Sequence, residues 1–399
     1  MLLEWITEDN FVSYRSGKLD VYRLHEDPYT NKRELQIIYG DSKRKEGGWK
    51  DLPGLTCMAF NRGSVQTSQN AIHHALAVGT NVGSVSLIDV INDVSTNDRT
   101  QVDTIRDDIL LCPPSKSGRR ACTGVAWHPT DPSLLAATFE KLRSDYSTVV
   151  WDVTSRTNFE STMSCPEVTK CSMDEAATTL AWCSFDSSSL LVGTVKGLLK
   201  LYDLRTFTKL SNEAMTIPAS NKKIKGIRCN PFNSHVIATF SETDVEPVKI
   251  WDLRKNGDAK SRMEPISSIQ ITGSPFDDGV LDDSNTRERK SSRTESMNAG
   301  NIVDVQWCTQ RENYISAVTT TCKKLQIYSV NDDRKLNAGP LYSISIPDQA
   351  FSTTNISKKS TFSSASTSNT IQAFCWQAAN KDSHTNIRAP RVLLGTDEG

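Results

Sequence analysis

ACTGVAWHPTDPSLLAATFEKLRSDYSTVVWDVT, residues 121–154, is the stretch that decides the fold of this chain. Three short apolar segments in it, CTGVAW, LLAATF and TVVWDV, have the length and the residue types of β-strands. HPTDPS, between the first two, is typical of a turn, because its prolines have no amide to donate and Asp131 can hydrogen-bond its own backbone. The charged segment EKLRSDYS precedes the third strand. The stretch therefore predicts three consecutive strands, joined by a turn and by a charged hairpin.

The same unit recurs along the whole chain. AVGTNVG (77–83) returns as LVGTVKG (191–197) and LLGTDEG (393–399), each an apolar strand followed by a tight turn that ends on glycine. A strand like CTGVAW lies upstream of each copy, and a strand like TVVWDV follows the first two, as SVSLIDV and LLKLYDL. The structural markers of these repeats are Trp127, Trp151, Asp152, Trp182, Tyr202, Asp203, Trp251, Asp252, Trp307 and Trp376.

Repeats of roughly 40–45 residues, with four strands and a Trp-Asp ending, are typical of the blades of a WD-type β-propeller. We therefore predict an all-β fold, a seven-bladed WD-repeat β-propeller that forms one domain over residues 1–399. The predicted blades span residues 2–24, 34–90, 100–153, 157–204, 208–253, 266–330 and 341–399. We expect incomplete first and last blades. The first would lack its innermost strand and the last its outermost strand, which we expect to follow Gly399 in a longer natural chain.

Two polar segments interrupt the repeats. Residues 273–300 (GSPFDDGVLDDSNTRERKSSRTESMNAG) have no strand or helix period, and residues 350–370 (AFSTTNISKKSTFSSASTSNT) are rich in serine and threonine. Such segments bury too little apolar surface to order a chain. We predict that both inserts are disordered.

The composition excludes two classes of partner. The net charge is −1, so the chain lacks the basic surplus with which proteins attract nucleic acid. No apolar run approaches the roughly 20 residues of a membrane-spanning helix, and the start, MLLEWITEDNF, lacks the basic region of a secretory signal. We predict no nucleic-acid binding and no direct membrane insertion.

The cysteines and histidines do not form a recognisable site. Six of the ten cysteines lie on or next to the repeated first strand, namely Cys57, Cys122, Cys183, Cys229, Cys308 and Cys375. We expect them to occupy one position in different blades, too far apart to pair, as buried apolar residues in a reducing cell. The remaining spacings match no zinc, nucleotide-binding or nucleophile motif. We predict no metal, no cofactor and no enzyme activity, although a propeller channel can host an active site.

The most distinctive charged feature is the hairpin at 140–147. Lys141, Arg143 and Asp145 alternate, so they can face the same side of an extended strand. Two interpretations remain open for these residues. They form a local ion pair, worth less than about 1 kcal/mol on a surface, or they belong to a docking surface for a partner protein.

This hairpin also carries a family resemblance. The run with Cys122, Trp127, Asp131, Lys141, Arg143, Asp145 and Trp151-Asp152 resembles the N-terminal propeller of the Mios family, the WD-repeat subunits of the GATOR and SEA complexes. LAWCSFDSSSLLVGTVKGLLKLYDLR and VKIWDLRK are similar to the next two blades, so the resemblance is specific over residues 121–255. Members of that family continue into a helical solenoid and a zinc module rich in cysteine and histidine.

The resemblance implies a role in amino-acid signalling to the TOR kinase complex. It also implies a cytoplasmic protein, attached to the vacuolar or lysosomal membrane through partner subunits that include a small propeller related to nuclear-pore and coat proteins. Our functional prediction is a non-catalytic protein-interaction scaffold of this kind. The alternative is a WD-repeat subunit of another assembly, such as a coat, a nuclear pore or a ubiquitin-ligase adaptor.

Overall fold

The computed structural model describes most of the chain between residues 1 and 399. The described residues are 1–6, 9–26, 33–39, 50–61, 65–66, 71–72, 75–89, 109–112, 120–142, 145–154, 167–171, 175–205, 212–242, 246–255, 263–269, 271, 301–320, 324–330, 340–345, 371–376 and 392–396. All 29 regular elements in these ranges are β-strands. The predicted disordered inserts, 273–300 and 350–370, lie outside the described residues.

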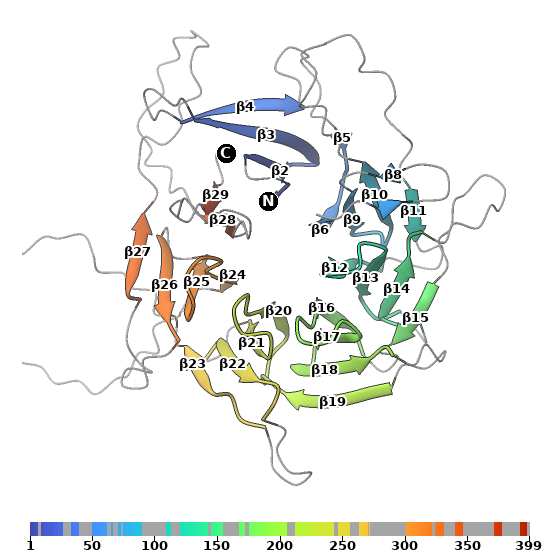
Figure 1. Ribbon diagram of the computed structural model, residues 1–399, viewed down its shortest axis with the longest axis vertical. Coiled ribbons are helices and arrows are strands. Elements are labelled where there is room, and N and C mark those ends of the chain that lie inside the picture. The colour runs from blue at the N-terminus through green and yellow to red at the C-terminus, as the bar shows by residue number, and fades with distance from the viewer. Residues whose placement is uncertain are drawn as a thin grey trace, which may run out of the picture.

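The strands form antiparallel sheets that stand around a common centre, as in a β-propeller (Figure 1). Six of the sheets have at least four strands, and we call them blades 1 to 6 in chain order. The innermost strands contact one another in the order β1, β6, β12, β16, β20, β24, β28 and back to β1. The two-stranded sheet of β28 and β29 therefore lies between blade 6 and blade 1.

The first three blades contain the following strands, from the inside outwards. Blade 1 contains β1 (Leu2–Trp5), β2 (Asn10–Arg15), β3 (Lys18–Glu26) and β4 (Arg33–Tyr39), and β5 (Lys50–Asp51) also pairs with β3. Blade 2 contains β6 (Leu55–Phe60), β9 (Ala75–Thr80), β10 (Val85–Asp89) and β11 (Ile109–Cys112), and a separate pair consists of β7 (Val65–Gln66) and β8 (Ala71–Ile72). Blade 3 contains β12 (Cys122–Trp127), β13 (Leu134–Phe139), β14 (Thr148–Asp152) and β15 (Glu167–Cys171).

The other blades repeat this arrangement. Blade 4 contains β16 (Ala177–Trp182), β17 (Ser189–Thr194), β18 (Leu198–Asp203) and β19 (Asn212–Pro218). Blade 5 contains β20 (Ile224–Cys229), β21 (Val236–Ser241), β22 (Val248–Asp252) and β23 (Ser267–Ile269). Blade 6 contains β24 (Ile302–Trp307), β25 (Tyr314–Thr319), β26 (Lys324–Ser329) and β27 (Tyr342–Ser345). The last sheet contains β28 (Ile371–Trp376) and β29 (Val392–Thr396).

The strands differ from the sequence expectation in two respects. The expectation that the first blade lacks its innermost strand is wrong, because β1 provides that strand although it has only four residues. In addition, each blade takes as its outer strand the one that follows the Trp-Asp strand, as β15 pairs with β14. Each predicted range ended with the Trp-Asp strand, whereas each sheet also includes the next strand in the chain. Strands that are consecutive in sequence pair most readily with each other, which accounts for this shift of one strand.

The core lies between neighbouring blades. In the second strand of blade 3, Leu135 and Ala137 pack against blade 2, whereas Ala136 packs with Leu180 of blade 4. Successive side chains of a strand point to opposite faces, so a strand between two neighbours must be apolar on both. The LLAATF segment meets this requirement and is buried over all but its first residue.

The cysteines do not share one position, and the expectation that they are too far apart to pair is wrong for two of them. Cys57 is the third residue of β6 and Cys122 is the first residue of β12. Adjacent inner strands bring these two positions together, so the two Sγ atoms lie 3.6 Å apart.

Candidate interaction site

The marker residues on the third strand of each blade are structural. Trp151, Tyr202 and Trp251 are buried between sheets, with 1–2% of their surface exposed. The indole N–H of Trp251 donates to the hydroxyl of Thr239 at 2.8 Å. These aromatic side chains fill the space between blades and none of them is accessible to a ligand.

The aspartates after these aromatic residues close a local turn. Asp152 accepts a hydrogen bond from the Thr154 amide at 2.9 Å. Asp203 and Asp252 each accept a hydrogen bond from the amide of the arginine two positions later. Each carboxylate also accepts from the guanidinium of that arginine, at 2.7–3.0 Å for Asp203 and at 2.8–3.0 Å for Asp252. The hydrogen bonds from the arginine side chain hold the pKa of each carboxyl below its ordinary value. These carboxylates are therefore engaged in turns and are poor candidates for catalysis.

The marker tryptophans of the inner strands connect neighbouring blades. Each ends its strand. In Trp127, Trp182 and Trp307 the indole N–H donates to the carbonyl of the penultimate residue of the preceding inner strand, whereas the Trp376 indole donates to the Ser316 hydroxyl. The pairs are Trp127 with Ala59, Trp182 with Ala126 and Trp307 with Arg228, each at 3.0 Å. Trp5 on β1 makes the same bond to Cys375 of β28 at 3.2 Å. We call these bonds the tryptophan latches.

A second set of latches lies at the opposite end of the inner strands. In blades 2 to 5, the second residue of the inner strand donates from its side chain to the carbonyl of the first residue of the next inner strand. The pairs are Thr56 with Cys122 at 2.6 Å, Thr123 with Ala177 at 2.9 Å, Thr178 with Ile224 at 2.6 Å and Lys225 with Ile302 at 2.9 Å. Sequence reasoning missed these residues, although a threonine or lysine at the second position recurs in LTC, CTG, ATT and IKG.

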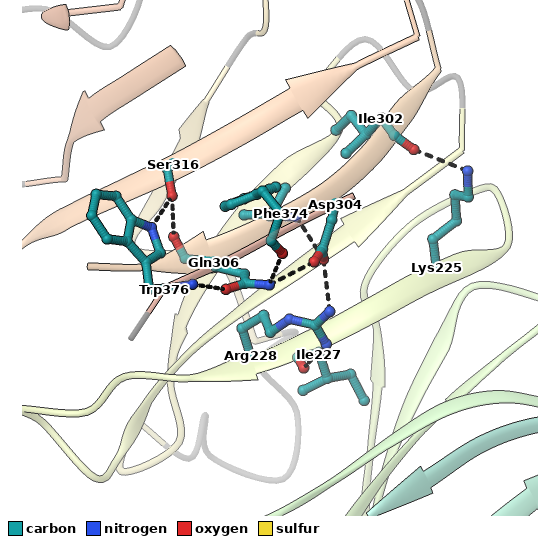
Figure 2. Close-up of polar contacts among 10 residues, drawn as sticks. Lys225, Ile227, Arg228, Ile302, Asp304, Gln306, Ser316, Phe374 and Trp376 are labelled. Carbon is teal, nitrogen blue, oxygen red and sulfur yellow. Dashed lines mark hydrogen bonds and ion pairs between the residues drawn. The ribbon is translucent and has the colours of Figure 1, made fainter. Parts of the chain in front are cut away.

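Blade 6 departs from this pattern and holds a polar cluster instead (Figure 2). Its second inner-strand residue is Val303, which has no side-chain donor. Asp304 accepts a 2.7 Å bond from Arg228 of blade 5, and Gln306 donates to Asp304 and to the carbonyl of Phe374 on β28, both at 2.8 Å. The cluster thus joins three inner strands, β20, β24 and β28.

The chemistry of this cluster is structural. One carboxylate oxygen of Asp304 accepts from Arg228 and from the Val305 amide, and the other accepts from Gln306. The marker residue Trp376 donates its indole N–H to Ser316 at 2.6 Å and its amide to Gln306 at 3.2 Å. The Asp304 carboxylate is thus engaged by three donors, which hold neighbouring strands together.

The charged hairpin of blade 3 is held by Arg120, a residue that sequence reasoning missed. The Arg120 guanidinium lies 4.6 Å from the centre of the Phe139 ring and donates to the carbonyls of Glu140, at 3.0 Å, and Tyr146. Arg120 also forms an ion pair with Asp145 at 3.9 Å. The Arg120 side chain is largely buried, whereas the Asp145 side chain is exposed. Arg143 lies outside the described residues. The partner of Asp145 that the structure describes is therefore Arg120, which precedes the hairpin in the chain.

The hairpin belongs to an exposed rim of the ring. Lys141 and Asp145 are exposed. The equivalent turns of blades 2 and 4 expose Val82 (41%) and Val195 (48%), and turns at one position in successive blades lie on the same face. We call Val82, Lys141, Asp145 and Val195 the hairpin rim. It combines exposed apolar and charged side chains on a rigid support, which suits protein recognition.

Metal sites and membrane-spanning helices are both absent from the part of the chain that the structure describes. Those residues include no group of three or more histidine, cysteine, aspartate or glutamate side chains placed to hold a metal ion. Within the same ranges, no helix has the length and apolar character needed to span a bilayer.

Comparison with known proteins agrees with the arrangement of the repeats. The chain is 28% identical over 210 residues to the GATOR2 complex protein MIOS of Dictyostelium discoideum, a match covering 41% of this chain and 18% of that protein. It is 31% identical over 153 residues to the GATOR2 complex protein MIOS-A of Xenopus laevis, covering 34% of this chain and 16% of the relative. The matches thus span less than a fifth of each relative's length.

The family comparison covers a larger part of the chain. The sequence model described as "MIOS, WD40 repeat" matches residues 51–281, which is more than half of the 399 residues. The match runs from the inner strand of blade 2 to beyond the last strand of blade 5, and includes the charged hairpin and its Arg120 support. The chain therefore belongs to the MIOS WD40-repeat family.

Proposed function

We propose that this chain is a non-catalytic scaffold that acts as a subunit of a GATOR2-type complex. The observation that carries this proposal is the family match over blades 2 to 5. It is supported by the inner strands, which the latches join into a ring, and by the exposed hairpin rim. The fixed inner strands keep the blades in place, so that the loops on the rim can be adapted to a partner. The engaged carboxylates of the Asp304 cluster and of the turns support the absence of a catalytic role.

We propose further that the propeller has seven blades, with β28 and β29 as the described strands of the seventh. The tryptophan latch supports this count, because Trp5 reaches the penultimate residue of β28 as Trp127, Trp182 and Trp307 reach the preceding inner strand. The contacts of β28 with β24 and β1 also support it. An experimental structure that placed β28 away from either neighbour would contradict the seven-blade count.

Membership of the family supports a proposal for the wider role. We propose that the complex regulates the TOR kinase complex in response to amino acids, and that the protein is cytoplasmic and peripheral on the vacuolar or lysosomal membrane. The partners would be the other GATOR/SEA-type subunits, including a small propeller related to nuclear-pore and coat proteins. Because the chain spans less than a fifth of its relatives' length, these partners are proposed for the longer protein.

Affinity purification of the tagged protein from its own cells tests the assignment. We expect the other GATOR2 subunits to co-purify with the wild-type protein. The double variant K141E/R143E reverses two charges of the hairpin and leaves the Arg120–Asp145 pair intact. It should recover the same subunits at least several-fold less, with an unchanged circular dichroism spectrum.

A matched control lies on the other face of the ring. Lys255 follows β22 at the end opposite the hairpins and is exposed, so K255E changes a charge without touching the hairpin rim. It should recover the partners as the wild type does. Recovery of coat, nuclear-pore or cullin-adaptor subunits in place of GATOR2 subunits would refute the proposal. Equal recovery by all variants would place the interface elsewhere than the hairpin.

A further inference from the structure

Cys57 and Cys122 form a close pair of thiols between two blades. Their sulfur atoms lie 3.6 Å apart, although the residues are 65 positions apart in sequence. The latch from the Thr56 hydroxyl to the Cys122 carbonyl, at 2.6 Å, holds the two backbones together beside them. A disulfide needs the sulfurs at about 2.05 Å, so rotation of the two side chains has to shorten the distance by about 1.5 Å.

Gly79 makes the room for this pair. A Cβ atom at Gly79 would lie 2.5 Å from the Cys122 sulfur and 2.7 Å from the Cys57 sulfur, so both sulfurs occupy the place that a side chain would take. The corresponding place between blades 4 and 5 is also above a glycine, but Thr179 and Ile224 meet there through methyl groups. Methyl groups therefore fill the equivalent space between blades 4 and 5. Close packing between two blades at this place does not require a pair of thiols.

The two thiols differ in ways that suit consecutive steps of oxidation. Cys57 is partly exposed and Cys122 is fully buried. The hydrogen bond between the sulfurs lowers the pKa of Cys57 and raises that of Cys122, which burial raises further. The thiolate is the reactive form, so Cys57 is the better nucleophile toward an oxidant from solvent.

We propose that Cys57 and Cys122 are a redox modification site, at which a peroxide forms a disulfide that links blades 2 and 3. The Cys57 thiolate attacks one oxygen of hydrogen peroxide, and the O–O bond breaks to give a sulfenic acid and, after protonation, water. The Cys122 sulfur then attacks the sulfenic sulfur and displaces the second water, while its proton leaves with that oxygen. Two thiols and one peroxide thus give one disulfide and two water molecules. A small-molecule thiol would reverse the link by exchange.

Peptide mapping of the folded 399-residue chain tests the proposal directly. The protein is treated with hydrogen peroxide, remaining thiols are alkylated in denaturant, and peptides are identified without reduction. We expect a peptide pair joined through Cys57 and Cys122, about 2 Da lighter than the two free peptides, which disappears after treatment with dithiothreitol. The link should also raise the melting temperature, because it closes a long loop of the unfolded chain.

Variants separate this pair from its neighbours. C57S and C122S should abolish both the joined peptide and the rise in melting temperature. C112S removes another thiol close to Cys122, and C229S removes one in blade 5, and both should retain the link. The proposal is overturned if the wild type keeps both thiols alkylatable, if Cys112 takes the place of either partner, or if Cys57 proceeds to sulfinic acid without a disulfide. The mapping of the wild type decides the matter even if a variant fails to fold.

Discussion

Replacement of Thr178 by valine should loosen the junction between blades 4 and 5. The Thr178 hydroxyl lies against the carbonyls of Gly193, at 3.0 Å, and Ile224, at 2.6 Å, and the residue is 8% exposed. Valine has nearly the same shape, and the equivalent position of β24 is already occupied by Val303, so a clash is not expected. The change removes a donor from buried carbonyls, which we expect to lower the free energy of unfolding by about 1–2 kcal/mol.

Urea unfolding measures the total loss, and hydrogen–deuterium exchange locates it. Exchange should accelerate in β16 and β20 before it does in distant blades, because only the junction between these strands is weakened. The variant T178S keeps the hydroxyl and loses the methyl group, and V303T adds a hydroxyl where the ring lacks one. We expect T178S to keep normal exchange in β20 and V303T to gain up to about 1 kcal/mol. A T178V variant as stable as the wild type, with a less stable T178S, would show that the methyl group matters and the latch does not.

Three further predictions concern buried groups and turns. Glu175→Leu removes an anionic partner of the buried Lys200 ammonium, 3.5 Å away, and should lower the free energy of urea unfolding by about 3–5 kcal/mol. A second change, Lys200→Met, should restore most of this loss. Gly197→Ala should lower the melting temperature and cost at least about 1–2 kcal/mol, because Gly197 has a φ of 80° and faces backbone carbonyls, whereas Val195→Ala on the same turn should not. Hydrogen bonds from Arg254 lower the pKa of Asp252, so this pair should stabilise the fold above the ordinary carboxyl pKa of about 4 and stop doing so as the pH falls through the lowered value. The assignment would be contradicted if the free energy of unfolding fell as steeply with decreasing pH in Arg254→Ala as in the wild type.

The strands could be predicted from the sequence because their residue types repeat. CTGVAW, LLAATF and TVVWDV became β12, β13 and β14 with nearly the expected bounds, since each is apolar and is limited by turn residues. The inner strand of the first blade was not predicted, because β1 has only four residues and has no threonine at its second position. A strand of that length has no clear period of its own, and it is recognised by its pairing with β2.

The contacts between blades could not be predicted from composition or spacing. The acceptor of each latch is a backbone carbonyl, which every residue has, so the donor alone does not reveal its partner. Arg120 was missed for the same reason, since most of its bonds are to the carbonyls of Glu140 and Tyr146. The closeness of Cys57 and Cys122 also requires the stagger between neighbouring inner strands, which is a property of the assembled ring.

The use of backbone acceptors explains how the fold tolerates divergence at the level of 28% identity. A latch needs one donor at a fixed position, such as Thr123 or Trp182, and makes no demand on the side chain that it meets. Neighbouring blades can therefore change most of their residues independently and remain joined. The residues of the hairpin rim take no part in the latches, so selection on partner binding can act on them without cost to the ring. A surface that can change while the inner strands stay joined suits the scaffold role proposed for this chain.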